Sequence, residues 1–433
     1  MSRNILLSAS LLFASAFAQQ PGTNTPEVHP TLMSQKCTKA GGCKAVNTSV
    51  VLDAGYRWLH NVGGYTNCVN GGFNATFCPD VATCAKGCAV EGVNYTSYGI
   101  NTAGNSLTLN LFKQDNGVTT QSSPRVYLLA NDTTYDMLML LNQELTFDVD
   151  VSKVPCGING ALYLSEMDAT GMASNLNPAG AKYGTGYCDA QCPKNTFVNG
   201  LPNINGTLGA CCNEMDIWEA NSATTAFTPH TCNITGTYAC TGADCSGSGV
   251  CDQGGCDFNA YRMGAPGFYG PNKIVDTTRK FTVVTQFITS DGTANGTLKT
   301  ISRSYVQDGK VIANANVNVT GMAATNSIDD TYCNAQVKTF GGVSTYERQG
   351  GMTGMGHSLA RGMVLIFSIW MDSGSGMQWL DGSTGSGSSP GSLRGPCSAT
   401  SGNTTMLTAD YPDAAVTFSN IKVGDLGTTF MAM

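Results

Sequence analysis

The chain has 433 residues, of which only 12% are charged, and its formal net charge is −7. This acidic balance argues against nucleic acid as a partner, because proteins bind nucleic acid largely by neutralising phosphates with Lys and Arg. The hydrophobic fraction of 42% is ample for a sizeable core. No shift in composition marks a linker, so we expect one large domain.

The first residues have the pattern of a secretion signal. A positive start at Arg3 precedes an apolar run from Ile5 to Phe17, and Ala16–Ala18 provides a small-x-small cleavage site. The sequence therefore predicts a signal peptide over residues 1–18 and a mature chain that begins at Gln19. The apolar run is too short to span a bilayer, and no second run is long enough. We expect a secreted, extracellular protein with no membrane partner.

Cysteine usage agrees with export. The count of 18 is even, and an exported chain meets an oxidising compartment in which cysteines pair. Zinc binding is the alternative, because Cys84 and Cys88, like Cys188 and Cys192, have ligand-like spacing. Sequons for N-glycosylation start at Asn47, Asn74, Asn94, Asn131, Asn205, Asn233, Asn295, Asn318 and Asn403.

Alternation of apolar and polar residues with period two predicts strands along much of the chain. The segments are Leu107–Leu111, Leu145–Val151, Lys280–Phe287, a hairpin over Thr300–Ile312 that turns at Asp308-Gly309, and Val416–Ser419. Met363–Trp370 is almost wholly apolar, which is typical of a strand buried on both faces. Helical periodicity is limited to Val81–Cys88 and Met352–Arg361. Many strands, Gly- and Asn-rich turns and few helices predict a β-sandwich.

The segment Cys211–Asn221 contains three carboxylates within six residues. On a strand, Glu214 and Asp216 face the same side, whereas Glu219 is out of phase with both. A β-bulge would absorb one extra residue and bring Glu219 to the same face. Crowded carboxylates usually ligate a metal or act in catalysis with separated pKa values. A solvated acidic strand and a calcium site are the alternatives to a catalytic pair.

Together with its flanking blocks, this acidic motif resembles the catalytic strand of the family-7 glycoside hydrolases, the fungal-type cellulases. The resemblance covers nearly the whole mature chain. The blocks that carry it are Glu27–Pro30, Val51–Trp58, Pro155–Tyr163, Gly180–Pro193, Thr228–His230 and Trp379–Asp381.

The resemblance implies an all-β fold, a curved two-sheet jelly-roll sandwich of the concanavalin-like type with long loops. It also implies retaining cleavage of β-1,4-glucan by two carboxyl groups. Position by position, Glu214 matches the nucleophile, Glu219 the general acid/base, and Asp216 the residue that orients Glu214. It implies no metal and no cofactor. A non-catalytic lectin with the same sandwich is the remote alternative, but it would not need both glutamates at this spacing.

The resemblance also implies residues that bind sugar. An indole ring can cover the apolar face of a pyranose, although core packing is the default role of a buried aromatic. The expected sugar platforms are Trp58, Trp370 and Trp379, whereas Trp218 in the acidic motif is as well explained by core packing. The expected polar contacts are Arg125, Asn159, Tyr163, Tyr187, Asp189, Gln191, His230, Arg262 and Arg394.

The family's cysteine pattern implies nine disulfides, a pairing that spacing alone does not determine. The implied bridges are Cys37–Cys43, Cys68–Cys88, Cys78–Cys84, Cys156–Cys397, Cys188–Cys212, Cys192–Cys211, Cys232–Cys251, Cys240–Cys245 and Cys256–Cys333. The chain lacks both cysteines of a further bridge near the N-terminus that cellobiohydrolase relatives often carry.

Loop lengths separate two modes of action in this family. Endoglucanases have open clefts, whereas cellobiohydrolases roof a tunnel with long loops. Pro193–Cys211 and Cys245–Cys251 are short here, which favours an endoglucanase. Gly382–Arg394, which includes the low-complexity stretch Gly382–Gly391, is longer than in open-cleft members and favours a processive cellobiohydrolase as the alternative. We expect a monomer with one catalytic domain over 19–433 and no carbohydrate-binding module.

Overall fold

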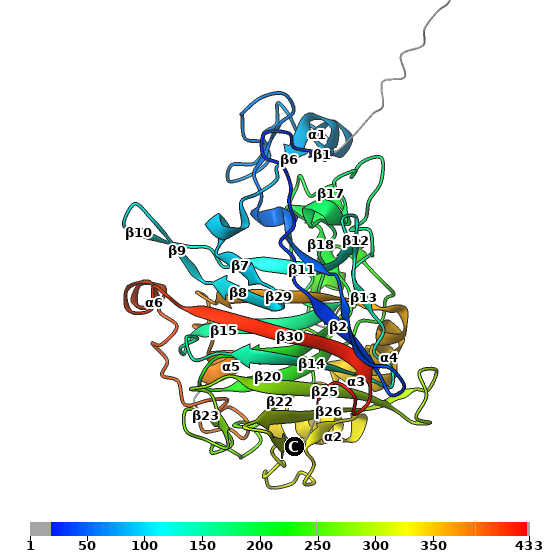
Figure 1. Cartoon of the computed structure of the whole chain (residues 1–433), viewed down its shortest axis with the longest axis vertical. Helices are drawn as coiled ribbons and strands as arrows, with labels where there is room; N and C mark the ends of the chain where they lie inside the picture. The colour runs from blue at the N-terminus through cyan, green and yellow to red at the C-terminus, as the bar shows by residue number, and fades with distance from the viewer. Residues whose placement is uncertain (1–18, 248, 386, 431–433) are drawn as a thin grey trace, which may run out of the picture.

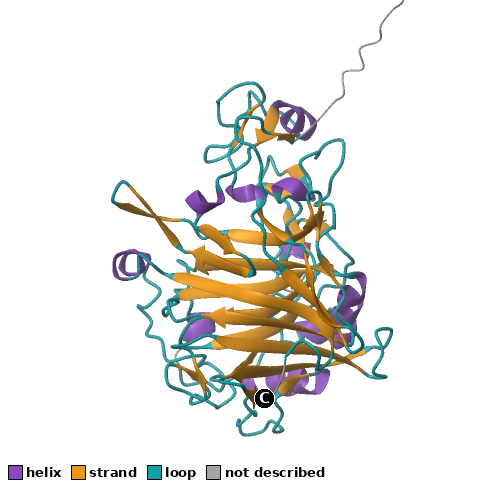
Figure 2. Cartoon of the chain, viewed as in Figure 1, coloured by secondary structure: helices purple, strands orange, loops and turns teal. Residues whose placement is uncertain are grey.

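Two large β-sheets face each other and form most of the molecule (Figures 1 and 2). The computed structural model describes residues 19–430 except 248 and 386. The predicted signal peptide, residues 1–18, therefore lies outside the described residues. Helices lie at the periphery of the sandwich in Figure 2, and long loops join the strands.

The sheet that carries the acidic motif has nine strands, and all of its pairings are antiparallel. Its strands in spatial order are β12 (Thr134–Tyr135), β11 (Arg125–Asn131), β29 (Met363–Met371), β15 (Ile158–Ser165), β19 (Glu214–Ala220), β20 (Thr225–His230) and β22 (Phe258–Asn259), with β4 (Ser49–Leu52) beside β11 and β13 (Met137–Leu138) beside β29.

The second sheet has ten strands, and β30 crosses the front of the molecule as the long red arrow of Figure 1. Its main path runs through β27 (Lys310–Ala313), β26 (Leu298–Gln307), β25 (Phe281–Thr289), β14 (Gln143–Asp150), β30 (Ala415–Asp425), β2 (Ser34–Thr38) and β3 (Gly42–Val46), with β28 (Ser327–Ile328), β8 (Ser106–Asn110) and β7 (Ile100–Ala103) at its sides.

The main hydrophobic core fills the space between the two sheets. Phe147 of β14 and Phe418 of β30 point inward from the ten-stranded sheet, and Trp218 of β19 and Phe367 of β29 meet them from the nine-stranded sheet. All four side chains are buried. Alternation places the inward residues of each strand in this layer, and the predicted two-sheet sandwich is confirmed.

The predicted strands are confirmed with small shifts at their ends. Met363–Trp370 lies in β29, whose residues are buried along nearly the whole strand. The predicted hairpin is β26 and β27, and both turn residues, Asp308 and Gly309, have positive φ. That conformation is the type I′ geometry which Asp-Gly favours, because glycine adopts positive φ without steric cost.

Two predicted helices are present, as α1 (Val81–Gly87) and α4 (Gly351–Arg361), but the expectation that these are the only helices is wrong. The additional ones are α2 (Asp330–Phe340), α3 (Thr345–Arg348), α5 (Gln378–Asp381) and α6 (Thr404–Asp410). Helix α2 begins at an Asp329 cap that accepts the Tyr332 amide at 2.7 Å. One of its three buried positions is the polar residue Gln336, so the apolar periodicity of this segment is too weak to predict a helix.

The remaining elements are short and lie in the loops. The strands are β1 (Gln20–Pro21), β5 (Leu59–Asn61), β6 (Cys88–Val90), β9 (Phe112–Asp115), β10 (Val118–Gln121), β16 (Phe197–Val198), β17 (Leu201–Pro202), β18 (Gly209–Cys211), β21 (Tyr238–Cys240), β23 (Tyr269–Gly270) and β24 (Val275–Asp276). Among the described residues, no helix has the length and apolar character needed to cross a membrane.

All nine implied disulfides are present, and no described cysteine is free. Within each pair that has ligand-like spacing, the two cysteines bond to different partners. Cys188 pairs with Cys212, and Cys192 pairs with Cys211. Their sulfurs are therefore not thiolates and cannot serve as zinc ligands.

Candidate active site

A β-bulge in β19 brings the three motif carboxylates to one face of the sheet. On β20, Asp216 pairs with Thr228 and Glu219 pairs with Ala226, so a step of three residues on β19 matches a step of two on β20. The pairing of β19 with β15 shifts over the same stretch. The expected bulge is confirmed, and it restores Glu219 to the phase of Glu214 and Asp216.

The opposite face of β19 is apolar. Met215, Ile217 and Trp218 are fully buried in the core between the sheets. Ile217 and Trp218 are consecutive, and two consecutive inward residues are what the bulge allows. Trp218 stands edge-on to Phe147 and Tyr269 at centroid distances of 6.2 and 5.9 Å. Of the two readings of Trp218, core packing is the one that holds.

A cavity of about 660 Å³ lies over the carboxylate face of the nine-stranded sheet. Most of the predicted site residues line it. They are Arg125, Tyr163, Tyr187, Asp189, Gln191, Glu214, Asp216, Glu219, His230, Trp370, Trp379 and Arg394. The sheet and its loops therefore gather these predicted residues in one cavity, although Arg125 and Arg394 are 269 positions apart in the sequence.

Glu214 is buried at one side of this cavity. Its Oε2 accepts a hydrogen bond from the Ala190 amide at 3.1 Å. Burial raises the pKa of Glu214 well above its ordinary value, and the charges of Asp216 and Asp189 act in the same direction. The His230 charge and the Ala190 amide oppose this rise, and so favour the ionised carboxylate that a nucleophile requires.

Asp216 and His230 form the ion pair at the centre of the cluster, with Nε2 of His230 3.1 Å from Oδ2 of Asp216. The other ring nitrogen, Nδ1, lies 2.9 Å from the backbone carbonyl of Asp252. Burial opposes the charge on the imidazole, but the hydrogen bond and charge of Asp216 raise the pKa of His230 to about 10. A side chain on Gly255 would collide with the ring, since a Cβ there would lie 2.5 Å from Cε1.

Glu219 lies on the other side of the pair and is partly buried. Asn159 of β15 donates from Nδ2 to its Oε1 at 2.9 Å, and Oδ1 of Asn159 accepts the Ala220 amide at 3.0 Å. Desolvation and the neighbouring charge of Asp216 raise the pKa of Glu219 to about 8. A carboxyl group that keeps its proton near neutrality is suited to act as a general acid.

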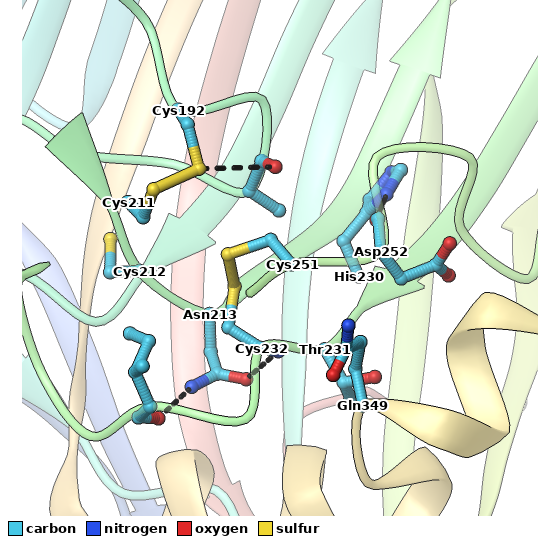
Figure 3. Close-up of a disulfide and its surroundings, with 12 residues drawn as sticks. Cys192, Cys211, Cys212, Asn213, His230, Thr231, Cys232, Cys251, Asp252 and Gln349 are labelled. Carbon is cyan, nitrogen blue, oxygen red and sulfur yellow. Dashed lines mark hydrogen bonds between the residues drawn. A yellow bond between two sulfur atoms is a disulfide. The ribbon is translucent and has the colours of Figure 1, made fainter. Parts of the chain in front are cut away.

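Disulfides support the loops on both sides of β19. Figure 3 shows Cys192–Cys211 and Cys232–Cys251 close to Asn213, the residue before Glu214. Oδ1 of Asn213 accepts the Cys232 amide at 2.7 Å. The His230 and Asp252 side chains lie beside these bridges in the same view. The start of the acidic strand is thus fixed covalently and by hydrogen bonds.

A chain of polar groups continues from Glu214 along the cavity. The hydroxyls of Tyr163 and Tyr187 are 3.0 Å apart, and Tyr187 donates to Oδ2 of Asp189 at 2.6 Å. The Arg125 guanidinium lies 3.4 Å from the centroid of the Tyr187 ring and pairs with Asp53 at 2.7 Å. These groups present hydroxyl and carboxyl oxygens to the space beside Glu214.

The other end of the cavity has stacked indoles and a compact ion cluster. Trp370 and Trp379 are 6.0 Å apart and stacked. Asp257 pairs with Nη1 of Arg394 at 3.0 Å and also with Nη1 of Arg262. Burial acts to raise the pKa of Asp257, but the charges of Arg262 and Arg394 hold it below its ordinary value.

Three predicted site residues do not line the cavity. Asn159 lies beneath it and reaches Glu219, while Arg262 supports Asp257 from behind and rests on the Phe340 ring at 4.6 Å. Trp58 lies elsewhere, stacked on His60 at 4.1 Å and on Tyr65 at 6.1 Å. The placement of Trp58 leaves its predicted role as a sugar platform untested.

The sequence reasoning missed several lining residues. Ala161, Ala226, Thr228 and Ser368 stand two positions from predicted site residues or from each other, so strand alternation was a signal that could have found them. The others have no such signal, because they come from loops and turns or from α5. They are Tyr56, Ser123, Gln253, Gly254, Asp257 and Leu380.

The close groups of possible metal-ligand atoms lie outside the carboxylate cluster. Among the described residues, each close group of three possible ligand atoms includes at least two cysteines that are already in disulfides. The carboxylates instead bond to Asn159, His230 and the Ala190 amide. The arrangement offers two carboxyl groups with raised pKa values, Glu214 held by the Ala190 amide and Glu219 by Asn159, in a cavity lined by hydroxyl, carboxyl and indole groups.

Comparison with known proteins agrees with this geometry. The model of glycosyl hydrolase family 7 matches residues 21–430. A probable endo-beta-1,4-glucanase celB of Aspergillus clavatus is 52% identical over 433 residues, covering 99% of each chain. The native Humicola insolens endocellulase EGI has a TM-score of 0.86 at 45% identity, covering 95% of this chain and all of that one. A Daphnia pulex cellobiohydrolase of that family has a TM-score of 0.90 at 42% identity, with the same coverage. The chain belongs to glycosyl hydrolase family 7.

Proposed function

We propose that this protein is a secreted endo-β-1,4-glucanase that cleaves internal bonds of cellulose or related β-glucans with retention of configuration. The observation that carries the proposal is the bulge in β19, which places Glu214, Asp216 and Glu219 on one face of the cavity. The name of the Aspergillus clavatus relative supports the endo mode.

The reaction proceeds in two displacements. Glu219, whose raised pKa keeps it protonated, donates its proton to the glycosidic oxygen while Glu214 attacks the anomeric carbon. A covalent glycosyl ester on Glu214 results. Glu219, now a carboxylate, removes a proton from water, which attacks the same carbon and releases Glu214. No metal or cofactor takes part in either step.

Asp216 and His230 tune the protonation of the two catalytic glutamates, Glu214 and Glu219. The His230 imidazolium sits against Asp216 and lowers the proton affinity of both glutamates. Trp370 and Trp379 offer stacked faces for pyranose rings, and Tyr163, Tyr187 and Asp189 offer hydrogen-bonding groups on the Glu214 side. Trp58 extends this binding surface toward the N-terminal loops in our proposal.

A processive cellobiohydrolase is the second candidate, and one feature favours it. The segment Gly382–Arg394 is tied to the opposite wall, because Arg394 pairs with Asp257 and the Gly391 carbonyl accepts from Arg262 at 3.0 Å. The short segments Pro193–Cys211 and Cys245–Cys251 favour the open cleft. We also propose that the protein acts as a monomer with one catalytic domain, secreted after removal of residues 1–18.

Viscosity and reducing ends of soluble carboxymethyl cellulose, followed together, distinguish these candidates. An endoglucanase lowers viscosity steeply for few new ends. Accumulation of cellobiose with little loss of viscosity would contradict the endo mode. Glu214→Gln serves as the control: loss of hydrolysis with retained binding of cello-oligosaccharides is expected, whereas full activity would contradict the catalytic assignment.

A further inference from the structure

A buried arginine from the opposite sheet contacts the bulge of the acidic strand. Arg303 lies on β26, which belongs to the ten-stranded sheet, and points across the core. Its Nη2 donates a hydrogen bond to the backbone carbonyl of Ile217. Ile217 is one of the two consecutive inward residues that create the bulge. The contact therefore joins the two sheets at the residue that breaks the strand alternation.

The surroundings of Arg303 are apolar and aromatic. The side chain is 2% exposed. Its Nε donates to Oγ1 of Thr285 at 3.2 Å, and the guanidinium carbon lies 4.3 Å from the centroid of the Phe227 ring. Among the described residues, Arg303 has no carboxylate within ion-pairing distance. Burial lowers the pKa of its guanidinium.

Such a side chain is an unusual choice for a core if packing is its only purpose. A buried charge without an opposite charge is costly, and an apolar residue of similar volume is often tolerated as well or better. A bulge, however, interrupts the ladder of hydrogen bonds and leaves a carbonyl in need of a donor. A guanidinium is planar and rigid, so it can hold several groups in fixed relative positions.

The groups held by Arg303 belong to both strands that define the spacing of the carboxylates. Ile217 lies between Asp216 and Glu219 on β19. Phe227, on which the guanidinium rests, follows Ala226, the residue paired with Glu219 on β20. Loss of the bulge would restore strict alternation along β19 and turn Glu219 away from the cavity and into the core. Fixing the bulge is therefore equivalent to fixing the position of the general acid.

We propose that Arg303 is a positioning residue that holds the β19 bulge and so sets the place of Glu219 relative to Glu214. Arg303 touches no substrate and acts through the backbone of Ile217. This inference rests on the proposed function of Glu214 and Glu219. It predicts that loss of Arg303 impairs proton donation more than it impairs the attack by Glu214.

The test compares Arg303→Met with wild type on two substrates by kcat/KM. Cellotetraose has a poor leaving group and needs the proton of Glu219, whereas 2,4-dinitrophenyl β-cellobioside has a leaving group that departs without it. Misplacing a catalytic group by about 1 Å can cost about 100-fold. We expect Arg303→Met to lower kcat/KM on cellotetraose by about 100-fold. On the dinitrophenyl substrate we expect the fall in kcat/KM to be about tenfold or smaller.

Phe147→Leu is the matched control. Phe147 packs against Trp218 from the ten-stranded sheet, and its side chain has no hydrogen-bond donor that could hold the Ile217 carbonyl. We expect its losses on the two substrates to be small and equal. Arg303→Lys keeps a positive charge and a hydrogen-bond donor but loses the planar guanidinium. We expect its kcat/KM on cellotetraose to lie between those of Arg303→Met and wild type. It carries the same test if Arg303→Met does not fold.

The outcomes separate the two proposals. Equal losses on both substrates in the Arg303 variants, or the same pattern in Phe147→Leu, would show that Arg303 only stabilises the core and would overturn the positioning role. Cellotetraose left uncleaved by the wild-type protein would overturn the proposed function itself. A leaving-group dependence confined to the Arg303 variants, with wild type active on both substrates, is the result that our proposal predicts.

Discussion

Glu219 and Asp257 line the same cavity, but their neighbours carry opposite charges. Glu219 stands near Asp216, whose negative charge adds to desolvation and raises the pKa of Glu219 to about 8. Asp257 stands between Arg262 and Arg394, which hold its pKa below the ordinary value although it is also removed from water. Burial acts in the same direction on both groups, so the neighbouring charges decide the outcome.

The difference assigns a role to each end of the cavity. In our proposal the Glu219 end keeps a proton ready for transfer, whereas the Asp257 end is an ion cluster that holds Arg262 and Arg394 in place. The variants below remove one carboxyl group or its partner at a time, and they are ordered from the largest expected effect to the smallest.

Removal of the nucleophile has the largest effect. Glu214→Gln keeps the shape of the side chain but cannot form the glycosyl ester, so kcat on cellotetraose should fall by at least about 10⁴-fold. Binding of cellotetraose, measured by tryptophan fluorescence, should change little, because Trp370 and Trp379 are untouched. A variant with a kcat within tenfold of wild type would rule out Glu214 as nucleophile.

Removal of the acid at the other side should produce a substrate-dependent loss. For Glu219→Gln we expect kcat/KM to fall by about 10²–10⁴-fold on cellotetraose. On the dinitrophenyl cellobioside the loss should be much smaller, because that leaving group needs no proton. The pH profile should also lose its alkaline limb near pH 8. An alkaline limb unchanged in the variant would assign that titration to another group.

The ion cluster should respond mainly in stability and only weakly in the pH profile of activity, because the charge of Asp257 is the smallest of the named contributions to the raised pKa of Glu219. Asp257→Asn leaves Arg262 and Arg394 without their shared carboxylate, and we expect a loss of about 3 kcal/mol in the free energy of unfolding. Because the pKa of Asp257 is lowered by folding, its contribution is present above its unfolded pKa and disappears as the pH falls through the folded value. Urea unfolding at neutral and acidic pH measures both effects. A shift of the alkaline limb larger than the one in His230→Asn would contradict the separate roles of the two ends, because the charge of His230 acts more strongly on Glu219 than that of Asp257.

Glu219 should make the stability of the wild-type protein fall with rising pH, which is opposite to the effect of Asp257. Folding raises the pKa of this carboxyl group from 4.5 to about 8, so the folded state binds more protons over that range. The free energy of unfolding should therefore fall as the pH rises from about 4.5 to about 8. Glu219→Gln should flatten this slope in urea titrations. An identical slope in Glu219→Gln would contradict the raised pKa.

The smallest effect is expected at His230. The positive charge of His230 lowers the pKa of Glu219, so His230→Asn should move the alkaline limb of the activity profile to higher pH. The magnitude of the rate at the optimum should change less than in the carboxylate variants. If the pH profile of His230→Asn is identical to that of the wild type, His230 has only a structural role.

Much of this picture was predictable because strand signals and the acidic motif are local. An unbroken apolar run located β29, alternation located the β26–β27 hairpin, and the phase of Glu219 predicted the bulge. The family resemblance supplied the cysteine pairing, which spacing could not. Helix α2 was missed because its buried face includes Gln336, which carries no apolar signal.

The rest depends on contacts between distant segments. Nothing beside Asp257 in sequence reveals that Arg394, 137 positions away, is its partner. Arg303 sits on an ordinary alternating strand, and its reach to Ile217 across the sandwich follows only from the packing of the two sheets. Side chains that act through such contacts are invisible to periodicity and to local motifs.

The most direct test of the account is to trap the reaction intermediate. Incubation with a 2-deoxy-2-fluoro-β-cellobioside that carries a good leaving group should leave a stable glycosyl ester, because the fluorine slows its hydrolysis. Peptide mass spectrometry should then find one cellobiosyl label on Glu214, and none in Glu214→Gln. A label on another carboxylate, or no label on an enzyme that turns over the unmodified glycoside, would contradict the central claim that Glu214, which the β19 bulge places on the same face as Glu219, is the nucleophile of a retaining enzyme.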